Sequence, residues 1–209
     1  MKTIKKRLLT SVLCAGVLSI GLVSTAHATL ESRLGGLAYY DTDLNITWAA
    51  NANINGFDTW DNQQTWVSGL SIGGIGGWRL ASADVNGDNN VVNCFGGGVT
   101  GCSDNEMGYL FWEENITGAS SGVFNNVQSF FYWSGTEFAP NPVNAWDFHF
   151  SHPFLVGNQD AIFKGNNMFA WAVHSGDVGA SSVPEPGTIA LLGLGLVGLL
   201  SFGRRLRRR

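Results

Sequence analysis

The chain has 209 residues, of which 44% are hydrophobic and 13% are charged, and its formal net charge is −4. This length allows one ordinary domain with targeting segments, and the hydrophobic content excludes an intrinsically disordered chain. Between Thr29 and Ala180, three basic residues against fifteen acidic ones give a net charge of −12. Such a segment repels nucleic acid, which we exclude as a partner.

The first 28 residues have the pattern of a cleavable signal peptide. Four basic residues between Lys2 and Arg7 precede an apolar run that ends at Val23. The small residues Ala26 and Ala28 then suit cleavage by signal peptidase. We therefore predict export across the inner membrane and a mature domain that covers residues 29–177.

The last 26 residues, 184–209, combine a short motif, an apolar segment and a basic end. The motif consists of Pro184, Glu185 and Pro186, and five arginines follow between positions 204 and 209. Residues 187–203 would span roughly 25 Å as a helix, which is enough to cross a bilayer. We predict a transmembrane helix with its arginines in the cytoplasm, preceded by a flexible linker at residues 178–183.

Taken together, the Pro-Glu-Pro motif, the short apolar helix and the terminal arginines resemble the PEP-CTERM sorting signal, which exosortases of Gram-negative bacteria recognise. An ordinary single-pass anchor shares the apolar segment and the basic end but lacks the motif. The resemblance implies a membrane-anchored precursor whose tail is cut near the motif by a membrane cysteine protease. It also implies a final place at the cell surface or in the extracellular matrix, because such tails are typical of species that make exopolysaccharide and biofilm.

The segment between the two ends predicts an α+β domain. One helix is expected from Asp58 or Thr59 to Leu70, and a capping box at 103–106 predicts a second helix that runs to Glu114. Apolar residues alternate with a period of two in other segments, which indicates antiparallel strands. Such strands are expected at residues 146–150 and 169–173. Further strands are expected at residues 37–40, 45–49, 78–80 and 130–134, which Gly, Asn and Pro residues separate.

Short words along this domain resemble the DUF1566 family, also called the Lcl C-terminal domain family. They are Leu44-Asn45-Ile46-Thr47-Trp48, Gly77-Trp78-Arg79-Leu80, Tyr132-Trp133-Ser134-Gly135-Thr136-Glu137, Ala145-Trp146 and Ala170-Trp171-Ala172-Val173. The resemblance implies a C-type-lectin-like fold, with two helices around a twisted antiparallel sheet. The chain departs from it at Ala81, where members often have Pro, and at His174, where they often have Arg.

Cys94 and Cys102 are the only cysteines that remain after removal of the signal peptide. An even pair in the Gly-rich loop of an exported protein predicts a disulfide, worth about 2 to 3 kcal/mol in the chain-entropy model. The alternative is a reactive cysteine, as an enzyme related to the formylglycine-generating group could use. No Lys or Arg lies near either cysteine in the sequence to lower a thiol pKa, so we favour the disulfide.

Asp84, Asn86 and Asp88 have the spacing of oxygen ligands at positions 1, 3 and 5 of an EF-hand-like calcium loop. The remainder of that motif does not follow, because position 6 is Asn89 and position 12 is Phe95. A turn rich in Asn, Gly and Asp is the alternative interpretation, and the sequence favours it. Calcium is thus the one cofactor that the sequence suggests.

Three functions are compatible with these features. The first is a non-catalytic module that binds polysaccharide through exposed Trp or Tyr rings and loop carboxylates; burial of all eight Trp would count against it. The second is a structural matrix component with an acidic surface. The third is an enzyme acting on the cell envelope, which we rank last because the sequence carries no recognisable catalytic motif.

Overall fold

The computed structural model describes residues 30–92, 94, 102, 104–150 and 157–180. Ala26, Ala28 and the motif at residues 184–186 lie outside this part, as does the transmembrane helix expected at residues 187–203. No helix within the described ranges is long and apolar enough to span a bilayer.

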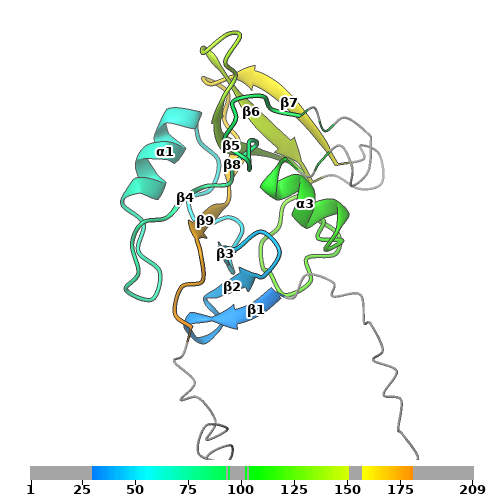
Figure 1. The fold of residues 1–209 in the computed structure, drawn as a ribbon. Helices are drawn as coiled ribbons and strands as arrows, with labels where there is room; N and C mark the ends of the chain where they lie inside the picture. The colour runs from blue at the N-terminus through cyan, green and yellow to red at the C-terminus, as the bar shows by residue number, and fades with distance from the viewer. Residues whose placement is uncertain (1–29, 93, 95–101, 103, 151–156, 181–209) are drawn as a thin grey trace, which may run out of the picture.

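Two β-sheets form the framework of the domain (Figure 1). The five-stranded sheet has the order β1 (Leu30–Arg33), β2 (Ala38–Asp41), β3 (Ile46–Ala49), β9 (Ala172–Ser175) and β4 (Arg79–Leu80). The four-stranded sheet has the order β7 (Asn158–Phe163), β6 (Asn144–His149), β5 (Phe131–Glu137) and β8 (Phe169–Ala170). Neighbouring strands are antiparallel, except that β5 and β8 are parallel.

The prediction of one strand at residues 169–173 was wrong. The segment is divided at Trp171, so that β8 pairs with β5 in one sheet and β9 pairs with β3 and β4 in the other. Residues 170–173 are all buried, because a chain that passes between two packed sheets is covered on both sides. A single antiparallel sheet was therefore too simple a description, although the α+β class, with two α-helices in the described part of the chain, is confirmed.

The first predicted helix is confirmed as α1 (Trp60–Ser68), with Thr59 at its N-cap position. The Oδ1 atom of Asp58 accepts hydrogen bonds from the Thr59 backbone N–H at 2.8 Å and from Asn62 Nδ2 at 2.7 Å. Asp58 therefore stabilises the first turn, where negative charge is favourable.

The second predicted helix is present as α3 (Glu106–Trp112), but its expected cap was wrong. Asn105 caps this helix, because its Oδ1 atom accepts a hydrogen bond from the Gly108 backbone N–H at 3.0 Å. Ser103, the expected cap, lies outside the described residues, and the Glu106 carboxylate pairs with Arg79. A long-range ion pair has thus replaced the local interaction that the sequence indicated.

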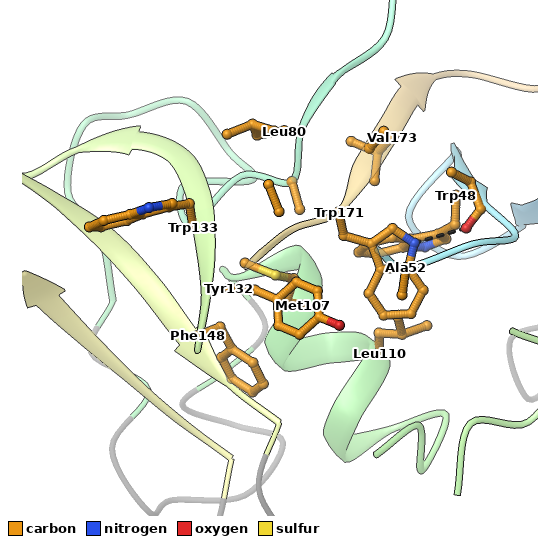
Figure 2. Packing of buried hydrophobic residues seen from close by; sticks show 14 of the residues in the cluster. Trp48, Ala52, Leu80, Met107, Leu110, Tyr132, Trp133, Phe148, Trp171 and Val173 are labelled. Carbon is orange, nitrogen blue, oxygen red and sulfur yellow. Dashed lines mark hydrogen bonds between the residues drawn. The ribbon is translucent and has the colours of Figure 1, made fainter. Parts of the chain in front are cut away.

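Trp171 lies at the centre of the core, at the point where the chain passes from one sheet to the other (Figure 2). Its indole Nε1 donates to the Ala49 carbonyl at 2.8 Å, and its ring contacts Trp48 and Phe124 edge-on. From the other side, α3 contributes Met107 and Leu110, neither of which has exposed surface. The two sheets and α3 therefore share one core.

Candidate functional site

A polar pocket of about 310 Å³ opens where β4, β5, α1 and the N-terminus of α3 meet. Its lining residues are Gln64, Arg79, Leu80, Ser82, Asp84, Val85, Glu106, Gly135 and Thr136. These residues come from both sheets and both α-helices, so the complete fold is needed to bring them together. We call this feature the Arg79 pocket.

A bidentate ion pair between Arg79 and Glu106 forms one wall of the pocket. Arg79 Nη1 lies 2.8 Å from Glu106 Oε2, and Nη2 lies 2.6 Å from Oε1. The Ser82 backbone N–H also donates to Oε2 at 2.7 Å. Glu106 is buried while the Arg79 side chain is 37% exposed, so the guanidinium is the part of the pair that a ligand can reach.

Two hydroxyl groups, those of Ser82 and Thr136, also line the pocket. Ser82 Oγ and Thr136 Oγ1 lie 3.3 Å apart, and Thr136 Oγ1 accepts a hydrogen bond from the Ala83 backbone N–H at 3.0 Å. Gln64 Nε2 donates to the Gly135 carbonyl at 3.3 Å, which holds the amide of Gln64 at the rim. The polar groups of the pocket are therefore fixed by one another before any ligand arrives.

Sequence analysis missed this pocket. Arg79 was noted only as part of a family word, and Ser82 and Thr136 were not singled out, because 54 residues separate the two hydroxyls. One signal was available: Arg79 is one of only three basic residues between Thr29 and Ala180. A basic residue that is rare in an acidic domain could therefore have indicated the pocket.

The predicted calcium loop lies beside this pocket. Asp84 Oδ1 and Oδ2 accept hydrogen bonds from the backbone N–H groups of Gly87 and Asn89, at 2.9 and 3.0 Å. Asn86 and Asp88 each accept one from the residue two positions further on, the pattern of an Asx turn. No group of three His, Cys, Asp or Glu side chains within the described part is arranged to hold a metal ion. Calcium binding here stays a prediction.

Cys94 and Cys102 lie at disulfide-bonding distance, with their Cα atoms 4.7 Å apart. Neither residue has exposed surface. The pair holds the chain just ahead of α3, close to Gly108, whose Cα faces the Cys102 side chain. The cysteines therefore support the start of the helix that carries Glu106.

The polysaccharide hypothesis requires exposed Trp or Tyr rings on the surface of the domain. None of the eight Trp and none of the four Tyr is exposed, since each is either half-buried or buried. Within the described ranges, the exposed rings are those of Phe57, Phe130 and Phe163, and Phe57 and Phe130 contact each other with centroids 5.6 Å apart. Binding by stacking on exposed Trp or Tyr is therefore disfavoured.

Comparison with protein families gives one match, which lies outside the described residues. Residues 182–209 match the PEP-CTERM protein-sorting motif. This match confirms the resemblance inferred from the tail and indicates an exported protein that exosortase sorts from a membrane-anchored precursor to the cell surface or extracellular space. No curated protein and no solved structure matches the chain.

The PEP-CTERM motif begins two residues beyond Ala180, the last described residue, so the tail adjoins the folded domain almost directly. The family comparison covers none of the domain itself. The resemblance to the DUF1566 family and to C-type lectins therefore stays a prediction.

All three basic residues of the exported domain are engaged in ion pairs. Arg33 pairs with Glu31 and Asp177, Arg79 with Glu106, and Lys164 with Glu137. Lys164 also lies over the Trp60 ring, 4.0 Å from its centroid. The positive charges of the domain are thus used within the fold, and the rest of its charge is acidic.

Proposed function

We propose that the exported domain is a non-catalytic binding module, and that the Arg79 pocket takes one sugar unit of a polysaccharide. The observation that carries this proposal is a concave site whose donors and acceptors come from four elements and are held in place by one another. Fixed polar groups suit the recognition of hydroxyl-rich ligands, because little side-chain entropy is lost on binding. The volume of about 310 Å³ is at the lower end for small-molecule sites, which suits a single ring.

The charge of the domain favours a neutral ligand over an acidic one. Fifteen acidic residues face three basic ones between Thr29 and Ala180, and each basic side chain already has an acidic partner. A polyanionic polysaccharide would be repelled at long range and would find only the partly exposed guanidinium of Arg79. We therefore expect the ligand to be a neutral polysaccharide.

The chemistry of the pocket supports binding better than catalysis. Its two carboxylates, those of Glu106 and Asp84, each accept hydrogen bonds from the protein at both oxygens. A general acid or base needs a carboxyl group that can exchange a proton with the substrate. These carboxylates are instead used to hold Arg79 and the adjacent loop in position.

A structural matrix component is the second candidate, and the burial of the tryptophans favours it. Without an exposed Trp or Tyr ring, the domain lacks the stacking surface with which many sugar-binding sites hold their ligands. On this interpretation the acidic domain associates loosely with the matrix and binds no defined polysaccharide.

Isothermal titration of the oxidised domain against a neutral dextran and an acidic alginate separates these candidates. The pocket variant is Gln64→Ala, and Thr65→Ala is the matched control, because Thr65 is exposed on the same helix and does not line the pocket. We expect saturable binding of a neutral polysaccharide that Gln64→Ala weakens at least fivefold and Thr65→Ala does not.

Dextran is the first probe, and the titration is repeated with other neutral glucans, galactans and mannans. Absence of saturable binding across this set would support the structural component. A parallel titration in EDTA tests the loop at Asp84, since loss of binding there would show a calcium requirement.

A further inference from the structure

The C-terminal end of β1, an edge strand of the five-stranded sheet, lies beside the chain that leaves β9 (Figure 1). Arg33, the last residue of β1, binds Asp177 through both carboxylate oxygens. Its Nε lies 2.5 Å from Oδ1 and its Nη2 lies 2.9 Å from Oδ2. This bidentate geometry fixes the chain two residues after the end of β9.

Further contacts hold the next residues of the chain. The Thr47 hydroxyl donates to the Gly176 carbonyl at 2.7 Å and accepts from the Val178 backbone N–H at 3.3 Å. Gly179 has a φ of +67° and lies so close to Leu34 that a Cβ there would collide with its side chain. The chain is therefore held as far as Gly179. We call the contacts of Arg33, Leu34 and Thr47 with residues 176–179 the terminal clamp.

Very little chain remains between the clamp and the sorting motif. Only residues 180–183 separate Gly179 from Pro184, and four residues reach at most about 14 Å when extended. A domain of roughly 150 residues has a radius of gyration of about 15 Å. While the tail is in the membrane, the folded domain cannot move away from it by more than about its own radius.

We propose that the terminal clamp sets the length of free chain presented to the exosortase, and that the edge around Arg33 and Asp177 is the surface of the domain that meets this enzyme. The exosortase must reach the motif at Pro184 across the short segment that the folded domain leaves between the clamp and the motif. The proposal adds a role for the domain in its own sorting, and it does not depend on the proposed sugar binding, because no residue of the clamp lines the Arg79 pocket.

The position of β9 explains why only the clamp can be released without unfolding the domain. β9 lies between β3 and β4, inside the five-stranded sheet, and Trp171 in the core precedes it directly. Residues 172–175 cannot detach without opening that sheet. Residues 176–179 lie beyond the strand, so releasing them would lengthen the free chain from four residues to eight.

The test follows removal of the tail from the full-length protein, co-expressed with an exosortase and measured by the change in mass during a pulse-chase. Deleting Ala180–Ser182 leaves one free residue, and we expect processing at least tenfold slower than in the wild type. Replacing the deleted residues by Gly-Ser-Gly should restore the wild-type rate, which shows that length matters and not sequence.

The decisive variant combines the deletion with Arg33→Ala. Weakening the clamp by loss of the Arg33–Asp177 contact should return at least a third of the lost processing rate. Glu31→Ala, the matched control that removes only the other partner of Arg33, should return none. A deletion variant processed at the wild-type rate would overturn the proposal, and so would a slow variant that Arg33→Ala does not rescue. Thermal unfolding of each purified protein checks that the domains remain folded.

Discussion

Arg79 and Glu106 are 27 residues apart in the sequence, yet their side chains form two parallel hydrogen bonds, of 2.6 and 2.8 Å, at the Arg79 pocket. The pair joins β4 to the first residue of α3. Glu106 thereby holds the guanidinium in a fixed orientation toward the pocket. The same contact fastens a helix to a two-residue strand, so stability and the proposed binding site depend on it together.

Arg79→Ala should therefore destabilise the domain. It leaves the buried Glu106 carboxylate without its cation, which costs about 3 to 5 kcal/mol for a fully buried pair. Because the Arg79 side chain is 37% exposed, we expect a smaller loss of about 2 kcal/mol. Urea denaturation measures it, and Arg79→Ala with Glu106→Gln should recover part of the loss. A change below about 0.5 kcal/mol would show that solvent screens the pair.

Asp147, in β6, makes the stability of the domain depend on pH. It has no exposed surface, its Oδ2 has no hydrogen-bond partner among the described residues, and burial raises its pKa to about 8. The folded state therefore keeps a proton that the unfolded chain releases near pH 4. The free energy of unfolding should fall as pH rises from about 4 to about 8 and change little from this group above that range.

Asp147→Asn removes this titration. The variant should unfold at about the same urea concentration as the wild type at pH 4 and at a clearly higher one at pH 9. Asp160→Asn is the control, since Asp160 is exposed on the neighbouring strand and pairs with Asp147 in register. Burial also raises the pKa of Asp41, so some slope should remain in the variant. Parallel pH profiles for Asp147→Asn and the wild type would refute the assignment.

Local patterns in the sequence predicted most of the fold. The helix at Trp60–Ser68 has its polar cap and its apolar face within one segment, and the strands at 38–41 and 46–49 are short segments bounded by Gly, Asp and Asn residues. The tail could be recognised for the same reason, because the motif, the apolar segment and the arginines are contiguous. Features that are determined within one contiguous segment could therefore be predicted from the sequence.

Features that depend on partners distant in the sequence could not be predicted from it. Glu106 has the sequence position of a capping-box residue, but an ion pair to Arg79 stabilises it more than a local hydrogen bond would. The strand Leu30–Arg33 was missed because only the first and last of its side chains are even half-buried, so it shows no apolar alternation. Neither the ion pair nor the strand can be found before the strands are paired.

Loss of the Cys94–Cys102 pair should weaken the domain without abolishing its fold. The cysteines are eight residues apart and enclose a short loop, so the chain-entropy model gives about 2 to 3 kcal/mol. The double variant to Ser should unfold at a temperature several degrees lower. Its far-ultraviolet circular dichroism spectrum should be unchanged. Labelling of thiols in the denatured wild type checks the premise, because two reactive thiols in the oxidised protein would mean that no disulfide forms.

Trp171→Phe tests whether the point where the chain changes sheets is the centre of stability. The substitution removes the hydrogen bond from Nε1 to the Ala49 carbonyl and part of the ring that packs against Trp48 and Phe124. A lost buried hydrogen bond and a small cavity together should cost about 2 to 3 kcal/mol in guanidinium denaturation.

Trp146→Phe provides the comparison for this prediction. Trp146 is half-buried in β6 and its ring contacts only Phe138 among the described aromatic residues, so its replacement should cost less than about 1 kcal/mol. Because Trp171 is packed between elements of both sheets, Trp171→Phe should also lower the unfolding midpoint without splitting the transition. Equal losses for the two variants would mean that the core does not depend on this position, and a biphasic transition would mean that the two sheets unfold separately.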